Sequence, residues 1–398
     1  MFARFPDLVS IVIPIRDEAA NLDRFLDRLV RLRYPEGAVE VLFAEGASRD
    51  GTRQKLLASF PLLAQAKPAW QFRLVDNPSG QIPAALNGAL AESRGEIAFR
   101  LDAHTLFPED YLERCVETLL RTGADNVGGV VVAVPGADSA TAQAIARARG
   151  DLFGAGNSSF RTGFSSGPRR TVPFGCFRRE VFGEVGLFDS RLLRNQDIEL
   201  NRRIVAAGGR VHQEGGIVSH YIAPATFGDL ARKHFANGVW NIHATAVSPR
   251  CLSPAHAIPG LFLLAVAASA AFHPWAPLAL LALQIGANLA RAAAVGRGVS
   301  RLRLFAAFLV IQTAHGLGQW RGLLGLALYL RRRRVQLLPA YRLGLSPSAN
   351  ASGTLETTQR YLPLGPRGID ATRSILTPTP PPSLSRSAPS SSASSRSP

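Results

Sequence analysis

Cysteine is scarce in this chain of 398 residues, which has only Cys115, Cys176 and Cys251. The three are far apart and form no Cys-x-x-Cys pair, so the sequence predicts neither a disulfide framework nor a zinc site. Such usage is typical of a reducing compartment. A signal peptide is also missing from the first residues, because the apolar run "VSIVIP" is short and ends at Pro14. We therefore expect the N-terminal part to stay in the cytoplasm.

Lysine is almost as rare, with three residues in the whole chain, and arginine carries the positive charge. Residues 291–398 hold fifteen arginines and two acidic residues, a net charge of +13, which leaves only +3 of the total of +16 for residues 1–290. Charge concentrated beside apolar segments indicates membrane orientation and contact with anionic lipid. An arginine bias of the genome is the alternative. Interleaved aromatic and basic residues are absent, so a nucleic-acid partner is excluded.

Long apolar runs are confined to the C-terminal part. Residues 257–272 and 275–296 are almost wholly apolar, and each approaches the length of about 20 residues that a membrane span needs. In a third run, 302–330, polar residues and the glycines of "HGLGQWRG" interrupt the pattern. We expect two spans and then a re-entrant or interfacial helical pair, with Arg331–Arg334 cytoplasmic as the positive-inside rule requires. Three simple spans are the alternative.

These patterns predict three regions: a catalytic domain over 1–245, a membrane region over 254–330, and a disordered Pro/Ser-rich tail over 343–398. In the first region short apolar runs alternate with amphipathic helical patterns. The runs are 9–14, 39–44, 72–76, 96–101 and 126–134, and helices are expected over 18–32, 196–209 and 226–240. Alternation of this kind predicts an α/β fold with a mostly parallel sheet. The Gly/Ser-rich stretch 153–170 predicts a mobile loop.

Acidic and polar residues follow several of the predicted strands. Asp102 and His104 end the strand in "AFRLDAHTLFPEDYL", Glu45 ends the strand before "GASRDGT", and Pro14 ends the first strand. Ligands bind beyond the carboxyl ends of parallel strands, so these turns should share one rim. Alternation would turn Asp102 and His104 to the same side, with Ala103 opposite, where both could hold one Mg2+ or Mn2+ together with phosphate oxygens. A plain surface turn with Asp102 as a helix cap is the alternative.

One further carboxylate stands at the start of the helix expected in "NQDIELN". Asp197 lies in the first turn, where the helix dipole favours a negative charge. It is either a helix cap or a general base that takes a proton from an attacking hydroxyl.

The order of several segments gives a more specific indication. Residues 9 to about 240 resemble a family 2 glycosyltransferase of the GT-A fold, and most of all the membrane-attached enzymes of succinoglycan-type exopolysaccharide synthesis. The segments that carry the resemblance are "VSIVIPIRDEAANL", "EGASRDGT", "NPSGQIPAALNGAL", "RLDAHTLFPEDYL", "GCFRREVFGEVGLFD", "RNQDIELNRRIVAAGG" and "ARKHFANGVW". The resemblance implies a nucleotide-sugar donor, a lipid-linked (polyprenyl) or polysaccharide acceptor, and a multi-pass protein of the bacterial inner membrane.

The resemblance also assigns roles to single residues. It implies that Pro14, Glu18 and Glu45 hold the nucleotide, that Asp102 and His104 bind the metal and the diphosphate, and that Asp197 is the base. Glu45 replaces the usual aspartate, His104 ends the metal motif as in the exopolysaccharide subgroup, and Gln196 replaces the usual glutamate beside the base. Asn241 stands where arginine is usual, after Trp240, so the acceptor-side roles of Gln196 and Trp240 are the weakest of the set.

The resulting expectation is an inverting transfer of a sugar from a donor like UDP-glucose to an acceptor hydroxyl. A metal-dependent nucleotidyltransferase is one alternative, although the turn "IPIRDEAANL" lacks the glycines that such an enzyme would use. A membrane-bound binding protein with a decayed catalytic domain is the other. Retention of Asp102 and Asp197 argues against decay.

Overall fold

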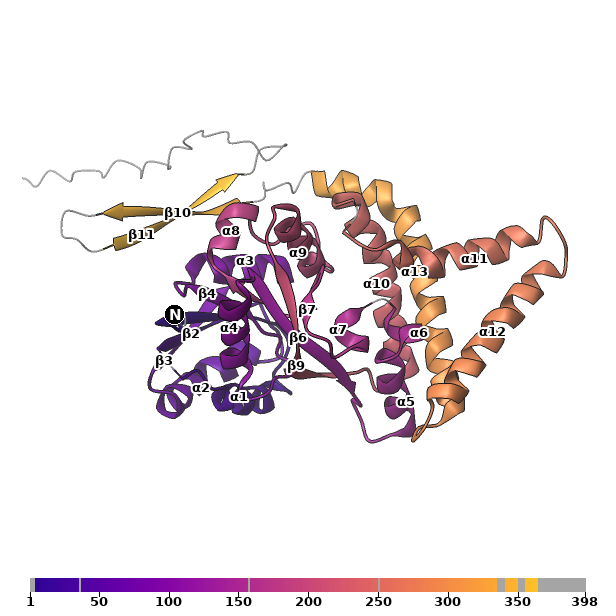
Figure 1. Ribbon diagram of the computed structural model, residues 1–398, viewed down its shortest axis with the longest axis horizontal. Helices are drawn as coiled ribbons and strands as arrows, with labels where there is room; N and C mark the ends of the chain where they lie inside the picture. The colour runs from indigo at the N-terminus through magenta and orange to yellow at the C-terminus, as the bar shows by residue number, and fades with distance from the viewer. Residues whose placement is uncertain are drawn as a thin grey trace, which may run out of the picture. The chain divides into compact units, whose positions relative to one another are not determined.

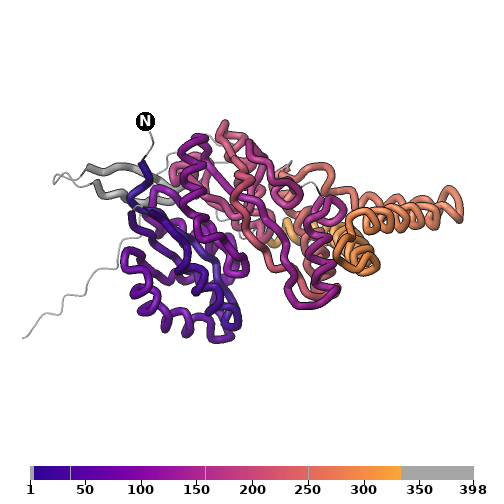
Figure 2. The backbone as a smooth tube through the Cα atoms, turned by 60° about the horizontal axis from the view of Figure 1, so that its bottom comes forward, coloured from indigo at the N-terminus to yellow at the C-terminus, as the bar shows by residue number. Residues whose placement is uncertain are grey.

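A computed structural model describes residues 4–35, 37–156, 158–249, 251–334, 341–349 and 355–363 (Figures 1 and 2). Its main sheet has nine strands: β1 (Leu8–Ile15), β2 (Ala38–Glu45), β3 (Trp70–Asp76), β4 (Ile97–Arg100), β5 (Thr105–Leu106), β6 (Asn126–Val134), β7 (Gly167–Pro168), β8 (Cys176–Arg178) and β9 (Val211–Ile222). The order is β3-β2-β1-β4-β8-β6-β9-β5, with β7 paired to β9. The mixed α/β fold with a largely parallel sheet is as predicted, and antiparallel β8 separates β4 from β6.

Helices cover both faces of the parallel half. They are α1 (Leu22–Arg31), α2 (Thr52–Ala66), α3 (Ile82–Glu92), α4 (Tyr111–Thr122), α8 (Glu180–Val185) and α9 (Gln196–Ala206). Ile11 and Ile13 pack under α1, α2 and α4, whereas Val12 faces α3, α8 and α9. Each of the three side chains is at most 1% exposed. A strand covered on both faces must be apolar at every position, which is why β1 reads as a continuous apolar run.

The parallel register brings the carboxyl ends of the first four strands to one rim. Ile15 pairs with Glu45, Glu45 pairs with Asp76, and the ladder between β1 and β4 ends at Val12 and Arg100. The predicted shared rim is therefore confirmed in the fold.

The stretch 153–170 is more ordered than its composition predicts. It contains α6 (Leu152–Ala155), α7 (Ser159–Thr162) and β7, and it follows α5 (Ala140–Arg149). Asp151 caps α6 through the Phe153 N–H at 3.0 Å, and Gln213 on β9 donates to the carbonyls of Gly163 and Ser165. A buried amide from a distant strand fixes this segment, and no local pattern reveals that contact.

The C-terminal part consists of α10 (Phe227–Val247), a 3-10 turn η1 (Pro254–Ala257), α11 (Ile258–Ser269), α12 (Ala276–Val295) and α13 (Arg301–Arg334). Among the described residues one helix, Ala276–Val295, is long and apolar enough to cross a membrane. Helix α11 has 12 residues, about 18 Å at the usual rise of about 1.5 Å per residue, which is too short for a span. The structure therefore supports one span of the two predicted.

The break expected at "HGLGQWRG" is wrong, because α13 is one helix of 34 residues. Its glycines serve close packing instead of a turn. A Cβ at Gly318 would overlap the Phe235 carbonyl of α10, and one at Gly238 on α10 would overlap the His315 carbonyl of α13. Small residues let two helix backbones approach, and α10 and α13 lie side by side in Figure 1.

The predicted tail begins inside a second sheet. Strands β10 (Tyr341–Ala349) and β11 (Leu355–Pro363) pair antiparallel. Residues 364–398 lie outside the described residues, so the prediction of disorder there stays a prediction.

Candidate active site

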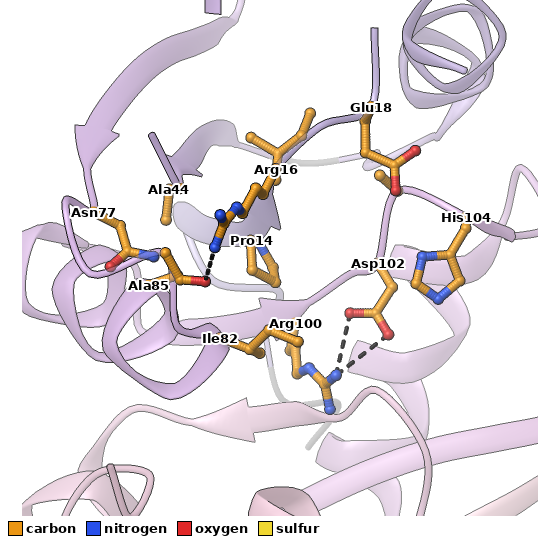
Figure 3. Close-up of a pocket in the computed structure, with 14 residues that line it drawn as sticks. Pro14, Arg16, Glu18, Ala44, Asn77, Ile82, Ala85, Arg100, Asp102 and His104 are labelled. Carbon is orange, nitrogen blue, oxygen red and sulfur yellow. Dashed lines mark hydrogen bonds and ion pairs between the residues drawn. The ribbon is translucent and has the colours of Figure 1, made fainter. Parts of the chain in front are cut away.

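A pocket opens at the rim where β1, β2 and β4 end (Figure 3). The end of β1 supplies Pro14, the loop after it supplies Glu18, and the turn after β4 supplies Asp102 and His104. Four of the five residues expected to hold the donor and metal therefore line one pocket. The chain turns here, since the Thr105 N–H donates to the Asp102 carbonyl at 3.1 Å. Because of that turn Ala103 also lines the pocket, and the expectation that it would face away is wrong.

The fifth residue, Glu45, is placed differently. Its side chain is 2% exposed, and it does not line the pocket within the described chain, although its neighbours Ala44 and Gly46 do. One oxygen accepts from the Ser48 N–H at 2.7 Å and the other from Arg53 at 3.3 Å. Burial opposes ionisation, but these hydrogen bonds hold the pKa of the Glu45 carboxyl below its usual value. In this structure Glu45 organises the turn beneath the pocket, and its contact with a donor stays a prediction.

The two loops at the pocket mouth are joined by side-chain hydrogen bonds to backbone groups. The Glu18 N–H donates to Thr52 Oγ1 at 2.8 Å, and the Asp17 N–H donates to Ser48 Oγ at 2.9 Å. Asp17 itself has a φ of 52°, a left-handed conformation that aspartate tolerates better than most residues. These bonds fix Glu18 at the rim without using its carboxylate.

Arg100, the last residue of β4, connects the two main carboxylates of the site. Its guanidinium lies 3.1 Å from Asp102 Oδ1 and 3.6 Å from Asp197 Oδ2. Arg100 is 8% exposed, and although burial disfavours its charge, Asp102 and Asp197 raise its pKa. The predicted metal ligand and the predicted base, 95 positions apart in sequence, thus contact the same cation.

Asp197 stands in the first turn of α9, as predicted. Its Oδ1 accepts from the Ile198 N–H at 2.9 Å, and its side chain is 32% exposed. It lines a second cavity of about 300 Å³, bounded by α5, α6, α7 and α10, by η1 and the start of α11, and by the middle of α13. A half-exposed carboxylate that faces a cavity and keeps a free lone pair can accept a proton from a hydroxyl.

The two weakest candidates do not line either cavity in the described part of the chain. Gln196 is buried, at 4% exposed, under the first turn of α9. Trp240 packs edge-on against the rings of His243 and Tyr329 at 5.2 and 5.9 Å. Both positions are those of packing residues, and their acceptor-side roles stay predictions.

The sequence reasoning missed several residues that line the first pocket, namely Arg16, Asn77, Gly80, Ile82 and Arg100. One signal for Arg100 was present, because an arginine inside an otherwise apolar strand needs a carboxylate partner. The others lie in two segments that carry the family resemblance, but that resemblance was not extended to these residues.

Asp102 and His104 are the expected ligands for a divalent cation in this pocket, which Glu18 also lines. His104 is exposed, and its ring contacts Tyr221 edge-on at 5.8 Å. No group of three or more His, Cys, Asp or Glu side chains among the described residues forms a complete metal cage. Two ligands from the protein, with phosphate oxygens and water for the rest, match how Mg2+ is usually held at nucleotide sites.

Comparison with known proteins agrees with this geometry. Residues 10–186 match the family model described as Glycosyl transferase family 2. The chain is 35% identical over 231 residues to the succinoglycan biosynthesis protein ExoA of Rhizobium meliloti (strain 1021), covering 57% of this chain and 67% of that protein. It is 25% identical over 224 residues to a dolichyl N-acetyl-alpha-D-glucosaminyl phosphate 3-beta-D-2,3-diacetamido-2,3-dideoxy-beta-D-glucuronosyltransferase of Methanococcus voltae, covering 54% and 67%.

Among solved structures, a mannosyltransferase from Pyrobaculum calidifontis in complex with GDP-Man and Mn2+ matches with a TM-score of 0.49 at 21% identity, over 80% of this chain and 87% of that one. The family match includes β4, the loop after β1 and the turn after β4. The match to ExoA covers two thirds of that protein. The chain belongs to glycosyl transferase family 2 and is a glycosyltransferase.

Proposed function

We propose that this protein is an inverting glycosyltransferase of the GT-A fold. It moves a sugar from a nucleotide-diphosphate sugar such as UDP-glucose to a hydroxyl of a lipid-linked or polysaccharide acceptor, in exopolysaccharide or cell-envelope synthesis at the inner membrane. The observation that carries the proposal is Arg100, which touches Asp102 at the donor pocket and Asp197 at the second cavity. One cation therefore sets the spacing between the donor and the base.

The reaction follows from that arrangement. Asp197 accepts the proton of the acceptor hydroxyl, whose oxygen attacks the anomeric carbon while the bond from that carbon to the diphosphate oxygen breaks. The nucleoside diphosphate leaves on the side of Asp102, opposite the attacking oxygen, so the anomeric centre inverts. Asp102 and His104 would hold Mg2+ or Mn2+, which neutralises charge on the leaving diphosphate. Arg100 lies between the Asp102 and Asp197 carboxylates and contacts both of them.

Membrane attachment is part of the proposal. Large apolar side chains are exposed along the three last helices, among them Leu261, Leu278, Leu283, Leu302 and Leu324. Exposed apolar surface of this extent is typical of contact with lipid or another protein. Arg291 near the end of α12 pairs with Asp151 at 2.7 Å, which ties this helix to the catalytic domain. The catalytic domain would then sit against the cytoplasmic face.

A donor screen tests the proposed activity. Purified protein in detergent is incubated with UDP-, GDP- and dTDP-sugars, and nucleotide release is measured with and without EDTA. We expect release from one donor class, stopped by EDTA and restored by Mn2+. Release of a sugar 1-phosphate in place of a nucleoside diphosphate would favour the nucleotidyltransferase, which breaks the bond between the two phosphates. The absence of release with every donor would favour a decayed domain.

A pair of leucines tests the membrane contact. Leu283 on α12 and Leu62 on α2 are both 68% exposed, so they form a matched pair. Leu283→Arg should move a large part of the protein from the membrane fraction to the soluble fraction, because arginine in mid-membrane costs about 2.5–3.5 kcal/mol. Leu62→Arg should leave the distribution unchanged. Equal behaviour of the two variants would contradict the assignment of α12 to the membrane.

A further inference from the structure

Three cations without a carboxylate partner in the described chain gather around Tyr221, beside the second cavity, which Arg149 and Arg161 line. Arg149 on α5, Arg161 on α7 and Lys233 on α10 surround the ring of Tyr221, with their charged groups 5.2, 5.8 and 4.4 Å from its centroid. We call these three residues the cationic cluster. No carboxylate among the described residues lies within 4.0 Å of their nitrogen atoms. Arg149 is 6% exposed.

Several partly buried arginines of the described chain are paired with carboxylates, unlike those of the cluster. Arg203 contacts Glu199 at 2.8 Å, and Arg291 contacts Asp151. In the cluster, by contrast, Arg149 Nε and Arg161 Nη1 are buried without any hydrogen-bond partner. Buried charge is costly unless it is paired, so a group of unpaired cations indicates a place where an anion binds.

The pKa values in the cluster show that burial and repulsion between neighbouring cations disfavour its positive charges. Burial and then the charge of Arg149 lower the pKa of Arg161 to about 9. Burial, followed by the charges of Arg149, Arg161 and Arg194, lowers the pKa of Lys233 to about 7. An anion that bound here would relieve this repulsion and favour the charged form of Lys233.

The cavity is lined by both charged and apolar side chains. Asp197, Arg149 and Arg161 line it together with Pro259 of α11 and Ile311 of α13. The outer surfaces of α11 and α13 carry the exposed leucines described above. A ligand with an anionic head and an apolar chain matches these surroundings.

We propose that the cationic cluster binds the phosphate or diphosphate of a lipid-linked acceptor, whose chain runs along the exposed apolar surface of α11 and α13. This inference rests on the proposed function, because it places the acceptor hydroxyl beside Asp197. The diphosphate of the donor is the other source of the same chemistry. The cavity favours the acceptor, since Arg149 and Arg161 line the cavity of Asp197 and not the donor pocket of Asp102.

Binding of two probes distinguishes the sources. Farnesyl diphosphate stands in for the lipid phosphate, UDP with Mn2+ stands in for the donor, and farnesol is the control without phosphate. Arg161→Gln and Lys233→Gln should each weaken farnesyl diphosphate binding about tenfold to a hundredfold, since hydrogen bonds to charged groups are among the strongest in proteins. UDP binding and farnesol binding should be unchanged. Lys233→Arg, which keeps the charge, should restore most of the affinity for farnesyl diphosphate.

Arg232→Gln is the matched control. Arg232 is next to Lys233 in sequence, but its side chain is 81% exposed and pairs with Asp229. We expect this variant to bind all three probes like the wild type. The two cluster variants should unfold at the same or a higher temperature than wild type when no ligand is present, because each removes an unpaired cation.

Two results would overturn the inference. One is farnesyl diphosphate affinity that is unaffected in both cluster variants, and the other is UDP affinity that falls in them as much as farnesyl diphosphate affinity. Failure of the proposed function is recognised separately, because it would show as the absence of nucleotide release by the wild-type protein with every donor.

Discussion

The donor pocket and the second cavity differ in whether their cationic side chains are paired with carboxylates. In the donor pocket the carboxylates and cations are balanced: Asp102 pairs with Arg100, and the neighbouring Glu45 pairs with Arg53. At the second cavity the cationic cluster outnumbers the single carboxylate of Asp197. Its members contact His234 and the Tyr221 hydroxyl but pair with no carboxylate of the described chain. A balanced pocket binds a diphosphate only with added positive charge, whereas the cluster can bind phosphate directly. We therefore expect a metal ion to bind the diphosphate in the donor pocket, one half of the site, and fixed cations to bind phosphate at the second cavity, the other half.

The largest effect should come from the residue where the halves meet. Asp197→Asn should lower sugar transfer about 10²–10⁴-fold, because an amide cannot accept the proton of the acceptor hydroxyl. The affinities for UDP and for farnesyl diphosphate should stay near wild type, which separates chemistry from binding. Transfer by the variant at a rate close to wild type would remove Asp197 from the mechanism.

The next largest effect should come from substitutions in the donor pocket alone. Asp102→Ala should abolish the dependence of UDP binding on Mn2+. It should also weaken UDP binding by more than the roughly 10–100-fold that is lost when a residue hydrogen-bonded to a metal ligand is removed. His104→Ala should do so only partly, because a charged carboxylate is the better ligand for a hard cation. Calorimetry measures both. Undiminished metal-dependent UDP binding in Asp102→Ala would refute the ligand assignment.

Arg100→Lys tests the connection between the halves and should have a smaller effect. A lysine keeps the charge but cannot contact Asp102 and Asp197 with separate nitrogen atoms, and we expect transfer to fall about tenfold. UDP affinity should fall less than the rate, since the spacing of donor and base is what changes. A rate equal to wild type would mean that Arg100 does not set that spacing.

The smallest effect concerns the wall of the second cavity. Gly238→Ala forces α10 away from α13, and overpacking of this kind costs about 1–3 kcal/mol. We expect a lower unfolding temperature and weaker farnesyl diphosphate binding, with UDP binding unchanged. Gly286→Ala is the control, because a Cβ at Gly286 meets no atom within 4 Å. The two variants should differ in both measurements, and identical behaviour would contradict the close packing of α10 on α13.

The donor half could be predicted from the sequence, and the second cavity could not. Parallel strands place consecutive strand ends on one rim, so the shared position of Pro14, Asp102 and His104 followed from strand order. The family resemblance then added Glu18, assigned the roles, and favoured the base over the helix cap for Asp197. Glu45 shows the limit of that reasoning: its place at a strand end was predicted correctly, but its burial depends on Arg53 and Ser48.

The second cavity is built from segments that share no sequence pattern. Arg149, Arg161 and Lys233 come from three helices, and one of these helices, α7, lies in a stretch predicted as a loop. The glycines of α13 suggested a break, although they are the residues that let α10 pack against it. Tertiary contacts decide both features, and neither contact has a local signature.

The central claim is that the two halves bind phosphate by different means, and one titration tests it most directly. The affinities of the wild-type protein for UDP and for farnesyl diphosphate are each measured with Mn2+ and with EDTA. The account predicts that EDTA weakens UDP binding by about tenfold or more and leaves farnesyl diphosphate binding within about twofold. Equal loss of both affinities in EDTA, or no loss of either, would contradict it.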